Sequence, residues 1–248
     1  MSPLSGKTAL VTGASRGIGR ASALALAQAG AQVLGHYCSE DAAANEVVAQ
    51  IRASGGHAEK VAADLRAPDG AHRLARRARL VIGARLDVLV ANAGIATDAS
   101  IEDTTVEQFD EMFALNVRAP YFLVQQLMPA MCKGSSVVLV SSLAAHASVG
   151  SLSAYGASKG AIDTLVKHFA LTLGTHGVRV NAIAPGVVAT GSSGLATTES
   201  GRGAILDMQT LKRIAQAADI GGAVVFLASN AARWITGETL RIDGGSKL

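Results

Sequence analysis

Tyr155 and Lys159 are the residues of this chain whose types and spacing most directly suggest chemistry. They lie at the end of a stretch that contains no charged residue between Lys133 and Lys159. Residues four positions apart lie on the same face of a helix, so the ammonium should lie beside the phenol. A neighbouring positive charge favours the phenolate, and we therefore expect the pKa of Tyr155 to be lowered. A tyrosine tuned in this way can act as a general acid or base.

A glycine-rich segment near the N-terminus predicts a second site. The apolar run at residues 8–11 has the composition of a buried parallel strand, and a helical pattern at residues 20–29 follows. Glycines between a strand and a helix allow backbone amides to approach a pyrophosphate at the positive end of the helix, although an ordinary tight turn is the alternative. The residues expected to contact a dinucleotide here are Gly13, Ser15, Arg16, Gly17, Ile18 and Gly19.

The end of the second predicted strand, residues 32–37, indicates which dinucleotide binds. In NAD enzymes an acidic residue at this position binds the ribose 2′-hydroxyl. This chain has no carboxylate here until Glu40. Arg16 could reach a 2′-phosphate from the glycine-rich segment, although a solvated loop arginine is the alternative. The charges therefore favour NADP(H) over NAD(H).

Polar and small residues follow two further predicted strands. Asp64 comes after the strand at residues 58–63, where its carboxylate could accept a hydrogen bond from an adenine amino group or could cap the next helix. The tripeptide Asn-Ala-Gly at residues 92–94 follows the strand at residues 87–91. Its small side chains would let a cofactor lie close to the backbone, so both segments are expected to line the same site.

Strand and helix patterns alternate along the whole sequence. Apolar runs predict strands at residues 8–11, 32–37, 58–63, 87–91, 137–140, 178–184 and 239–242. Helical patterns lie between them at residues 20–29, 40–54, 68–81, 105–131, 153–174 and 214–228. Such alternation is typical of a parallel sheet covered on both faces. We predict one α/β domain over residues 1–248, a doubly wound Rossmann-type parallel sheet of about seven strands.

One segment is expected to cover the site rather than to build the sheet. Residues 191–208 are rich in Gly, Ser and Thr and show weak periodicity. Such composition is typical of a mobile loop, and loops of this kind often close over a substrate. We therefore predict a substrate lid near residues 191–212.

Composition and charge exclude several classes of protein. Hydrophobic residues make up 49% of the chain and charged residues 17%, which indicates a compact fold rather than a disordered one. The formal net charge is only +3, and the densest basic run, residues 72–79, has the pattern of a solvated helix face rather than a phosphate-binding patch. We therefore expect no nucleic-acid partner.

The apolar segments and the cysteines predict the cellular compartment of the protein. No stretch has the length and apolarity of a membrane span, and the first residues lack an apolar signal core. The two cysteines, Cys38 and Cys132, show no metal-ligand spacing and suit a reducing compartment. We therefore expect a cytoplasmic protein that binds neither a membrane nor a metal.

Taken in order, these segments resemble the short-chain dehydrogenases/reductases. The resemblance extends from Lys7 to Gly245, and the ending at residues 235–245 is similar to that of the 3-oxoacyl-acyl-carrier-protein reductase and glucose dehydrogenase-like group. The motifs that carry it are Thr12-Gly13-x3-Gly17-x-Gly19, Asn92-Ala93-Gly94, Asn116, Ser142, Tyr155-x3-Lys159 and Pro185-Gly186.

The resemblance implies a role for each matching residue. Tyr155 would exchange a proton with the substrate, Lys159 would hold the nicotinamide ribose and lower the pKa of Tyr155, and Ser142 would orient the carbonyl. Asn116 would position a water in a proton relay to Lys159, and Thr190 would contact the nicotinamide carboxamide. The cofactor contacts expected beyond the glycine-rich segment are Tyr37, Asp64, Leu65, Asn92, Ala93, Gly94, Tyr155, Lys159, Pro185, Gly186, Val188 and Thr190.

The activity implied is interconversion of a carbonyl and an alcohol on a small-molecule substrate by hydride transfer from or to NADP(H). Alternatives are an NAD(H)-dependent alcohol dehydrogenase, a 3-oxoacyl-acyl-carrier-protein reductase and a non-catalytic dinucleotide-binding sensor. The carrier-protein reading is weakened because residues 175–177 lack the arginine expected to meet an acidic partner. A sugar-nucleotide epimerase would need a larger C-terminal domain. The resemblance also implies a homotetramer, with a homodimer as the alternative.

Overall fold

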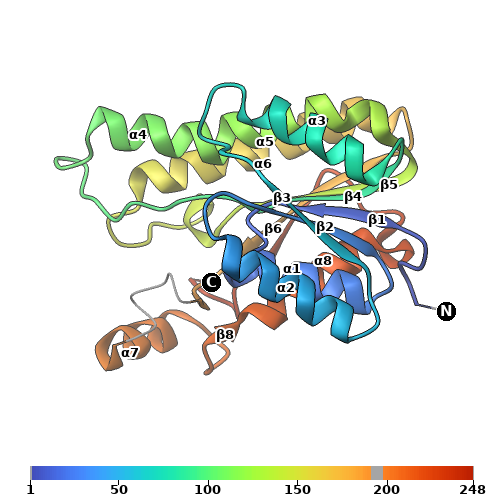
Figure 1. Cartoon of the computed structure of the whole chain (residues 1–248). Helices are drawn as coiled ribbons and strands as arrows, with labels where there is room; N and C mark the ends of the chain where they lie inside the picture. The colour runs from blue at the N-terminus through green and yellow to red at the C-terminus, as the bar shows by residue number, and fades with distance from the viewer. Residues whose placement is uncertain (1, 191–197, 248) are drawn as a thin grey trace.

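A parallel sheet of seven strands forms the centre of the computed structural model, which describes residues 2–190 and 198–247 (Figure 1). Its strand order is β3-β2-β1-β4-β5-β6-β9, and every neighbouring pair is parallel. The strands are β1 (Thr8–Val11), β2 (Gln32–Tyr37), β3 (Ala58–Ala62), β4 (Leu86–Ala91), β5 (Met131–Val140), β6 (Arg179–Pro185) and β9 (Thr239–Ile242). The predicted doubly wound fold is therefore confirmed.

Helices cover both faces of this sheet. The described helices are α1 (Gly17–Gln28), α2 (Asp41–Ala53), α3 (Gly70–Ile82), α4 (Val106–Phe113), α5 (Ala119–Leu127), α6 (Ser153–Gly174), α7 (Glu199–Met208) and α8 (Ala217–Ala228). Helices α3, α5 and α6 pack on one face, and α1, α2 and α8 pack on the other (Figure 1). The sheet carries two apolar cores as a result.

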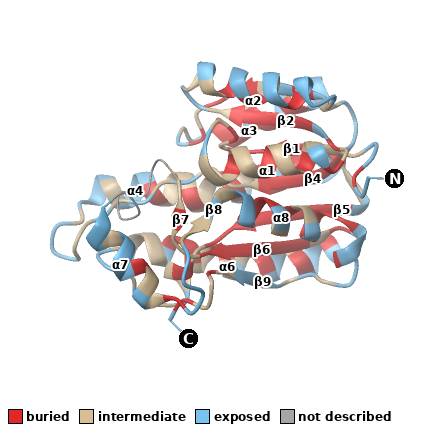
Figure 2. Cartoon of the chain, turned by 90° about the horizontal axis from the view of Figure 1, so that it is seen from below, coloured by how far each residue is buried: buried red, intermediate tan, exposed pale blue. Residues whose placement is uncertain are grey.

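The central strands are largely apolar because both of their faces are buried. In β1, Leu10 joins one core, whereas Ala9 and Val11 join the other. The same alternation holds in β5, where Leu139 packs with α5 and α6, and Val138 packs with α8. Figure 2 shows the strands as buried between layers of helices with exposed outer surfaces. A continuous apolar run is the sequence pattern that this arrangement requires.

Three elements differ from the predictions. Residues 199–208 form α7, not a loop, and this helix lies outside the sheet (Figure 1). Strand β5 begins at Met131, because a register shift lets its first residues pair with β4 although they lack strand periodicity. The predicted helix over residues 105–131 is divided by a π-turn, Ala114–Arg118, and ends at Leu127 before a 3-10 turn. Residues 191–197 of the predicted lid lie outside the described part of the chain.

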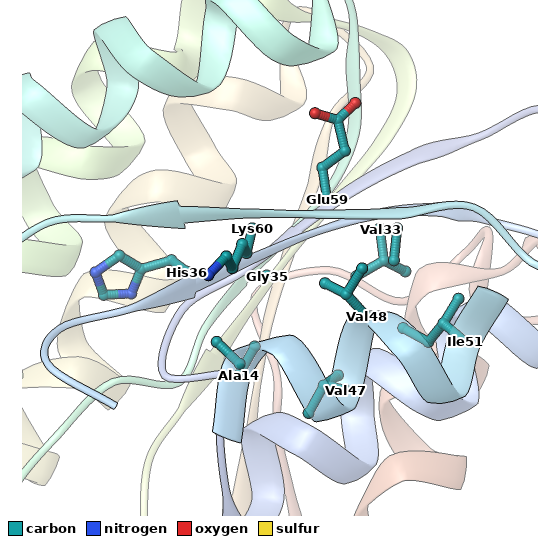
Figure 3. Close-up of a pocket in the computed structure, with 11 residues that line it drawn as sticks. Ala14, Val33, Gly35, His36, Val47, Val48, Ile51, Glu59 and Lys60 are labelled. Carbon is teal, nitrogen blue, oxygen red and sulfur yellow. The ribbon is translucent and has the colours of Figure 1, made fainter. Parts of the chain in front are cut away.

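The gap between α2 and the sheet is too small to be a binding site (Figure 3). Val33, Val47, Val48 and Ile51 line it, and its volume is about 10 Å³. A cavity needs roughly 10–15 Å³ to hold one water molecule. We therefore treat this space as ordinary core packing.

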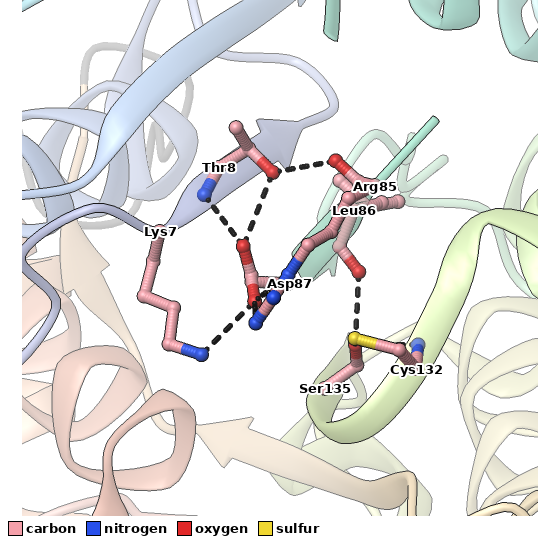
Figure 4. A network of polar contacts seen from close by, with 7 residues as sticks. All are labelled: Lys7, Thr8, Arg85, Leu86, Asp87, Cys132 and Ser135. Carbon is pink, nitrogen blue, oxygen red and sulfur yellow. Dashed lines mark hydrogen bonds and ion pairs between the residues drawn. The ribbon is translucent and has the colours of Figure 1, made fainter. Parts of the chain in front are cut away.

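At the amino edge of the sheet, a buried carboxylate joins β1 to β4 (Figure 4). Asp87 is 2% exposed and accepts hydrogen bonds from Lys7 Nζ at 3.0 Å, Thr8 N at 3.0 Å and Arg85 Nη2 at 2.7 Å. Burial opposes ionisation of Asp87, but these donors outweigh it and hold the pKa of the carboxyl below its usual range. The network lies at the opposite edge from the site described next.

Two kinds of feature are absent from residues 2–190 and 198–247. No described helix is long and apolar enough to cross a membrane. No three His, Cys, Asp or Glu side chains in those residues are grouped so that they could hold a metal ion.

Candidate active site

A cleft of about 670 Å³ opens where the carboxyl ends of the strands meet. Ligands bind at this edge of open α/β sheets, at the point where the strand order reverses, and here that point lies between β1 and β4. The predicted residues that line it are Gly13, Ser15, Arg16, Gly17, Ile18, Tyr37, Asp64, Leu65, Asn92, Ala93, Gly94, Ser142, Tyr155, Lys159, Pro185, Gly186, Val188 and Thr190. Gly19 and Asn116 are the predicted residues that do not line the cleft; they lie behind it.

The glycine-rich turn between β1 and α1 is shaped by close backbone contacts. Gly13 and Gly17 have φ values of 64° and 54°, a region that residues with a Cβ rarely adopt. A Cβ on Gly19 would overlap the carbonyl oxygen of Gly13, so this position requires glycine. The turn thus leads directly into the N-terminus of α1, where free amides and the helix dipole favour an anionic group.

Asn92 and Thr12 fasten this turn to β4. Thr12 Oγ1 accepts hydrogen bonds from the backbone amides of Asn92 and Ala93, each at 2.9 Å. Asn92 Nδ2 donates to the carbonyl of Thr12 at 2.8 Å. The small residues after β4 therefore hold the floor of the cleft at a fixed distance from the glycine-rich turn.

His36 is a site residue that the sequence did not predict. It is buried in β2, its Nδ1 accepts a hydrogen bond from the amide of Gly13 at 3.2 Å, and its Nε2 lies 3.0 Å from the carbonyl of Ala63. These partners require the tautomer with the proton on Nε2. Burial lowers the pKa of His36 to about 4, so the ring is neutral near pH 7. The available signal was a polar side chain within an apolar strand.

Opposite charges meet at the expected adenosine end of the cleft. Arg16 Nη1 lies 2.7 Å from Glu40 Oε1, and Ser15 Oγ donates to Glu40 Oε2 at 3.3 Å. The sequence predicts that Arg16 is available for a phosphate, whereas the fold brings Glu40 beside it. The chain reverses direction after Ser39 and so places Glu40 beside Arg16. The spacing of residues in the sequence does not reveal this contact.

Asp64 does not cap the following helix. Its Oδ1 accepts hydrogen bonds from the backbone amide of Arg66 at 3.0 Å and from Arg66 Nε at 3.1 Å. The N-cap position of α3 is occupied by Asp69. The Arg66 contacts lower the pKa of Asp64, so the carboxylate is charged and lines the cleft.

Tyr155 and Ser142 present two hydroxyl groups to the same part of the cleft. Tyr155 lies in the first turn of α6 and Ser142 follows β5, and both residues line the cleft. Burial raises the pKa of Tyr155, and the neighbouring Ser142 hydroxyl opposes this change without reversing it. The expectation of a lowered Tyr155 pKa is therefore wrong for the protein without ligands, because desolvation of the phenolate dominates.

Lys159 lies beneath Tyr155, one helical turn along α6. Its Nζ is 5.6 Å from the centre of the Tyr155 ring and donates a hydrogen bond to the carbonyl of Val140 at 2.7 Å. Burial lowers the pKa of Lys159 to about 8, and the charge of Asp163 partly opposes this shift. The predicted same-face geometry is confirmed, but the ammonium is held towards β5 rather than towards the phenol oxygen.

Asn116 holds two elements of the site together from behind. It is 1% exposed; its Oδ1 accepts from the amide of Ile95 at 2.9 Å, and its Nδ2 donates to the Ile95 carbonyl at 2.9 Å and to Ser158 Oγ at 3.0 Å. Ser158 in turn donates to the carbonyl of Tyr155 at 2.7 Å. The π-turn directs this side chain towards α6 and the segment after β4, so it links them.

Comparisons with known proteins agree with this geometry. A family model described as enoyl-(acyl carrier protein) reductase matches residues 13–247. Versicolorin reductase stcU of Emericella nidulans is 36% identical over 98% of this chain and 96% of its own. L-rhamnose 1-dehydrogenase (NAD(P)(+)) of Sphingomonas sp. is 36% identical over 99% of this chain and 98% of its own.

A solved structure shows the same likeness in three dimensions. The crystal structure of the angucycline C-6 ketoreductase LanV with bound NADP is 40% identical to this chain and superposes with a TM-score of 0.94. The match covers 99% of this chain and 97% of that one. With a family match across nearly the whole chain and with Ser142, Tyr155 and Lys159 gathered at one cleft, this protein belongs to the short-chain dehydrogenase/reductase family.

Proposed function

We propose that this protein is an NADP(H)-dependent oxidoreductase that interconverts a carbonyl and an alcohol, with Tyr155 as the general acid and base. The observation that carries the proposal is the placement of two hydroxyls, Ser142 and Tyr155, at one cleft beside a buried Lys159. Family membership supports it, as do relatives named as reductases and a dehydrogenase. The complete set of three residues argues against a non-catalytic sensor.

The protonation states of the site residues suit reduction of a carbonyl. Because burial raises the pKa of Tyr155, its hydroxyl is protonated at neutral pH and can donate. A substrate carbonyl between Tyr155 and Ser142 would accept a hydrogen bond from each hydroxyl, which stabilises the negative charge that develops on its oxygen. NADPH, when bound, supplies the hydride that reaches the carbonyl carbon. Tyr155 then gives its proton to the oxygen, and the Lys159 ammonium below the ring stabilises the tyrosinate.

The cleft has the shape that a dinucleotide needs. The amides around Gly13 and Gly17 and the N-terminus of α1 would hold the pyrophosphate. A Cβ on Gly94 would come within 2.9 Å of Asn116 Oδ1, so the segment after β4 keeps a bare backbone facing the cleft. Arg16 would meet the 2′-phosphate after leaving Glu40, and the LanV structure with NADP supports this choice of cofactor.

The other predicted contacts complete the cofactor site in this proposal. Asp64 would accept a hydrogen bond from adenine, and Thr190 would contact the carboxamide. Because the Asn116 side chain is committed to Ile95 and Ser158, a water-mediated relay to Lys159 would use its backbone carbonyl. Residues 191–212 would act as the lid, of which α7 is the described helical part.

The substrate end of the cleft supports an uncharged, largely apolar carbonyl compound. Leu143, Val149 and Leu152 line it beside Ser142 and Tyr155. Among the described lining residues, the charged ones are Arg16, Glu40, Asp64, Arg66 and Lys159. All but Lys159 come from the segments around the adenosine end, so a carboxylate or phosphate on the substrate would find no partner at the substrate end among the lining residues that the structure describes.

We also propose that the protein works in the cytoplasm as a homotetramer. Trp234 is 96% exposed, Leu240 is 41% exposed on the edge strand β9, and Val106 and Phe109 are exposed on α4. Apolar surfaces of this kind mark interfaces. Both cysteines are free, which suits a reducing compartment. Light scattering of the purified protein tests the assembly: the mass of one chain, or of two, contradicts the tetramer.

Turnover of a carbonyl panel tests the activity. Aryl ketones, acyl thioesters and sugars are incubated with NADPH or NADH while absorbance of the reduced nicotinamide is followed. We expect aryl ketones with NADPH to be reduced fastest.

Tyr155→Phe should lower kcat by about a thousandfold, because general acid catalysis contributes roughly 10²–10⁴-fold, while NADPH still binds. Tyr121→Phe, on the outer surface of α5, is the matched control. Undiminished turnover by Tyr155→Phe would remove Tyr155 from the mechanism.

A further inference from the structure

Asp163 is a mostly buried carboxylate on α6, four residues after Lys159. Its side chain is 19% exposed, and its two oxygens have different partners. Oδ2 lies 3.2 Å from Nε2 of His146, and Oδ1 accepts a hydrogen bond from Thr239 Oγ1 at 2.9 Å. The spacing of four places Asp163 on the face of α6 that carries Tyr155 and Lys159. One carboxylate therefore connects this helix to two other parts of the molecule.

The His146 contact reaches the segment that holds Ser142. The Ser142 hydroxyl accepts a hydrogen bond from the amide of Ala144 at 3.2 Å, which begins a 3-10 turn, Leu143–Ala145. His146 ends this turn, and its amide donates to the Leu143 carbonyl at 2.9 Å. The His146–Asp163 contact therefore fixes the far end of the Ser142 turn against the helix that carries Tyr155.

Beside the His146–Asp163 contact, the Ser142 turn and α6 pack so closely that neither can shift without a clash. A Cβ on Gly156, the residue after Tyr155, would lie 2.6 Å from the carbonyl oxygen of Ala144. Ser141 Oγ donates to the Lys159 carbonyl at 3.3 Å. The Ser142 turn and the first two turns of α6 are therefore in direct contact. Asp163 extends this contact by one more helical turn towards the C-terminus of α6, where it meets His146.

The charge of Asp163 acts on Lys159. Lys159 faces the Val140 carbonyl from β5 and, across Gly94, the Asn116 amide from the π-turn, and both are uncharged. Its own helix supplies Tyr155 and Asp163, and Asp163 is the charge that raises the pKa of Lys159 against the effect of burial. Removing this carboxylate would make the ammonium easier to deprotonate.

We propose that Asp163 is a positioning residue of the active site, which holds the Ser142 turn through His146 and places a negative charge one helical turn from Lys159. The proposal rests on the proposed function for its kinetic consequences. Its electrostatic half concerns the ionisation of Lys159 in the protein without substrate and can be measured without turnover.

Two substitutions separate the two roles. Asp163→Asn keeps the size and hydrogen-bonding capacity of the side chain, because its carbonyl oxygen can accept from Thr239 and its amide can donate to the ring nitrogen of His146, but it removes the charge. Asp163→Ala removes both. Thr239→Val is the matched control, since it deletes one hydrogen bond to Asp163 and leaves the charge in place.

The first readout is the protonation midpoint of Lys159, followed by NMR of protein labelled with ¹³C at the lysine Cε and assigned with Lys159→Met. We expect the midpoint to fall by about one pH unit in Asp163→Asn, as for loss of a charge acting through an effective dielectric constant near 20. Thr239→Val should leave it unchanged. A midpoint in Asp163→Asn equal to that of the wild type overturns the electrostatic role, whether or not a substrate has been found.

The second readout is the pH dependence of reduction of the best aryl ketone from the panel. In Asp163→Asn we expect kcat near pH 6.5 to stay within threefold of the wild type, with the alkaline loss of activity moved to lower pH. In Asp163→Ala we expect kcat to fall about tenfold at every pH, with the KM for NADPH changed less than twofold. Equal kcat in wild type and Asp163→Ala overturns the positioning role. Absence of turnover by the wild type contradicts the proposed function instead.

Discussion

In the function proposed above, the ion pair between Arg16 and Glu40 would set the preference between two cofactors. Both side chains are largely exposed, so their mutual attraction is modest. A 2′-phosphate carries more charge than the Glu40 carboxylate and accepts a bidentate contact from a guanidinium. On this proposal, binding of NADP(H) would exchange the Glu40 partner of Arg16 for a stronger one, whereas NAD(H) would offer no such exchange.

This exchange predicts opposite effects of two substitutions on cofactor choice. Arg16→Ala should weaken NADPH binding by about tenfold or more and leave NADH binding within about twofold, because a charged hydrogen-bond pair contributes roughly 1.5–3 kcal/mol. Glu40→Gln should strengthen NADPH binding, since Arg16 is then released at lower cost. Fluorescence titration of each variant with both cofactors measures the ratio. A similar loss for NADH and NADPH in Arg16→Ala would show that Arg16 does not contact the 2′-phosphate.

His36 makes the stability of the glycine-rich turn dependent on pH. Its pKa is about 4 in the folded protein and near 6.5 when unfolded, so the folded state favours the neutral ring. This contribution is complete above pH 6.5 and is lost as the pH falls towards 4, because the unfolded chain takes up the proton first. A difference of this size corresponds to roughly 3 kcal/mol.

Urea unfolding at pH 7 and pH 4.5 measures this dependence, with His36→Asn as the variant that cannot titrate. We expect the wild type to lose more unfolding free energy between the two pH values than His36→Asn does, by about 2–3 kcal/mol. Asn can still accept from the Gly13 amide through its side-chain oxygen. Parallel losses in the two proteins would mean that another group controls acid sensitivity.

At the scale of elements, the turn between β1 and α1 depends on the glycine at position 19, whereas the helical glycine at position 222 is unobstructed. A Cβ at Gly19 would overlap the Gly13 carbonyl, whereas a Cβ at Gly222 in α8 would meet nothing within 4 Å. Gly19→Ala should destabilise the protein by about 1–3 kcal/mol and abolish NADPH binding at micromolar concentrations. Gly222→Ala should instead stabilise it by about 0.5–1 kcal/mol. Thermal unfolding and cofactor titration distinguish the two variants, and similar behaviour in both would refute the steric argument.

The sequence predicted the elements whose pattern follows from burial. The seven strands could be found because a parallel strand buried on both faces must be apolar, and the glycine-rich turn could be placed because it follows such a strand. Helix α7 was missed because its Gly, Ser and Thr residues weaken the helical period. The π-turn at Asn116 could not be inferred, since one additional residue in a helix leaves no signature in residue types.

The roles of several site residues were harder to predict from the sequence, because they depend on contacts that only the fold creates. Tyr155, Lys159 and Ser142 could be assigned from spacing and resemblance, and the cleft brings them together. His36 and Glu40 act through contacts with the glycine-rich turn, more than twenty residues away in sequence. The direction of the Tyr155 pKa was wrong because spacing reveals a neighbouring charge but not the loss of solvent.

At the scale of the whole molecule, stability and chemistry occupy opposite edges of the sheet. The Asp87 network closes the amino edge, while the cleft opens at the carboxyl edge. We expect Asp87→Asn to lower the unfolding free energy by about 2 kcal/mol, because Lys7 and Arg85 lose a buried charged partner. At 25 °C its kcat and KM should match those of the wild type.

Urea unfolding and steady-state kinetics on the same preparation check this separation. Asp69→Asn is the matched control, since Asp69 pairs with Arg73 at the surface, where ion pairs contribute little. Its unfolding curve should coincide with that of the wild type. A changed KM in Asp87→Asn would show that the two edges of the sheet are coupled.

The π-turn Ala114–Arg118 determines which changes in chain length the molecule can accept. A π-turn contains one residue more than the α-helical turn it replaces, so a single-residue deletion there would leave one continuous helix. Helices α4 and α5 would keep their buried faces, and only the Asn116 contacts would be lost. A deletion within α5 would instead rotate the rest of that helix by about 100° and turn Leu123 and Leu127 out of the core. Relatives that lack one residue at this turn should therefore fold normally, yet without the link from Asn116 to Ser158.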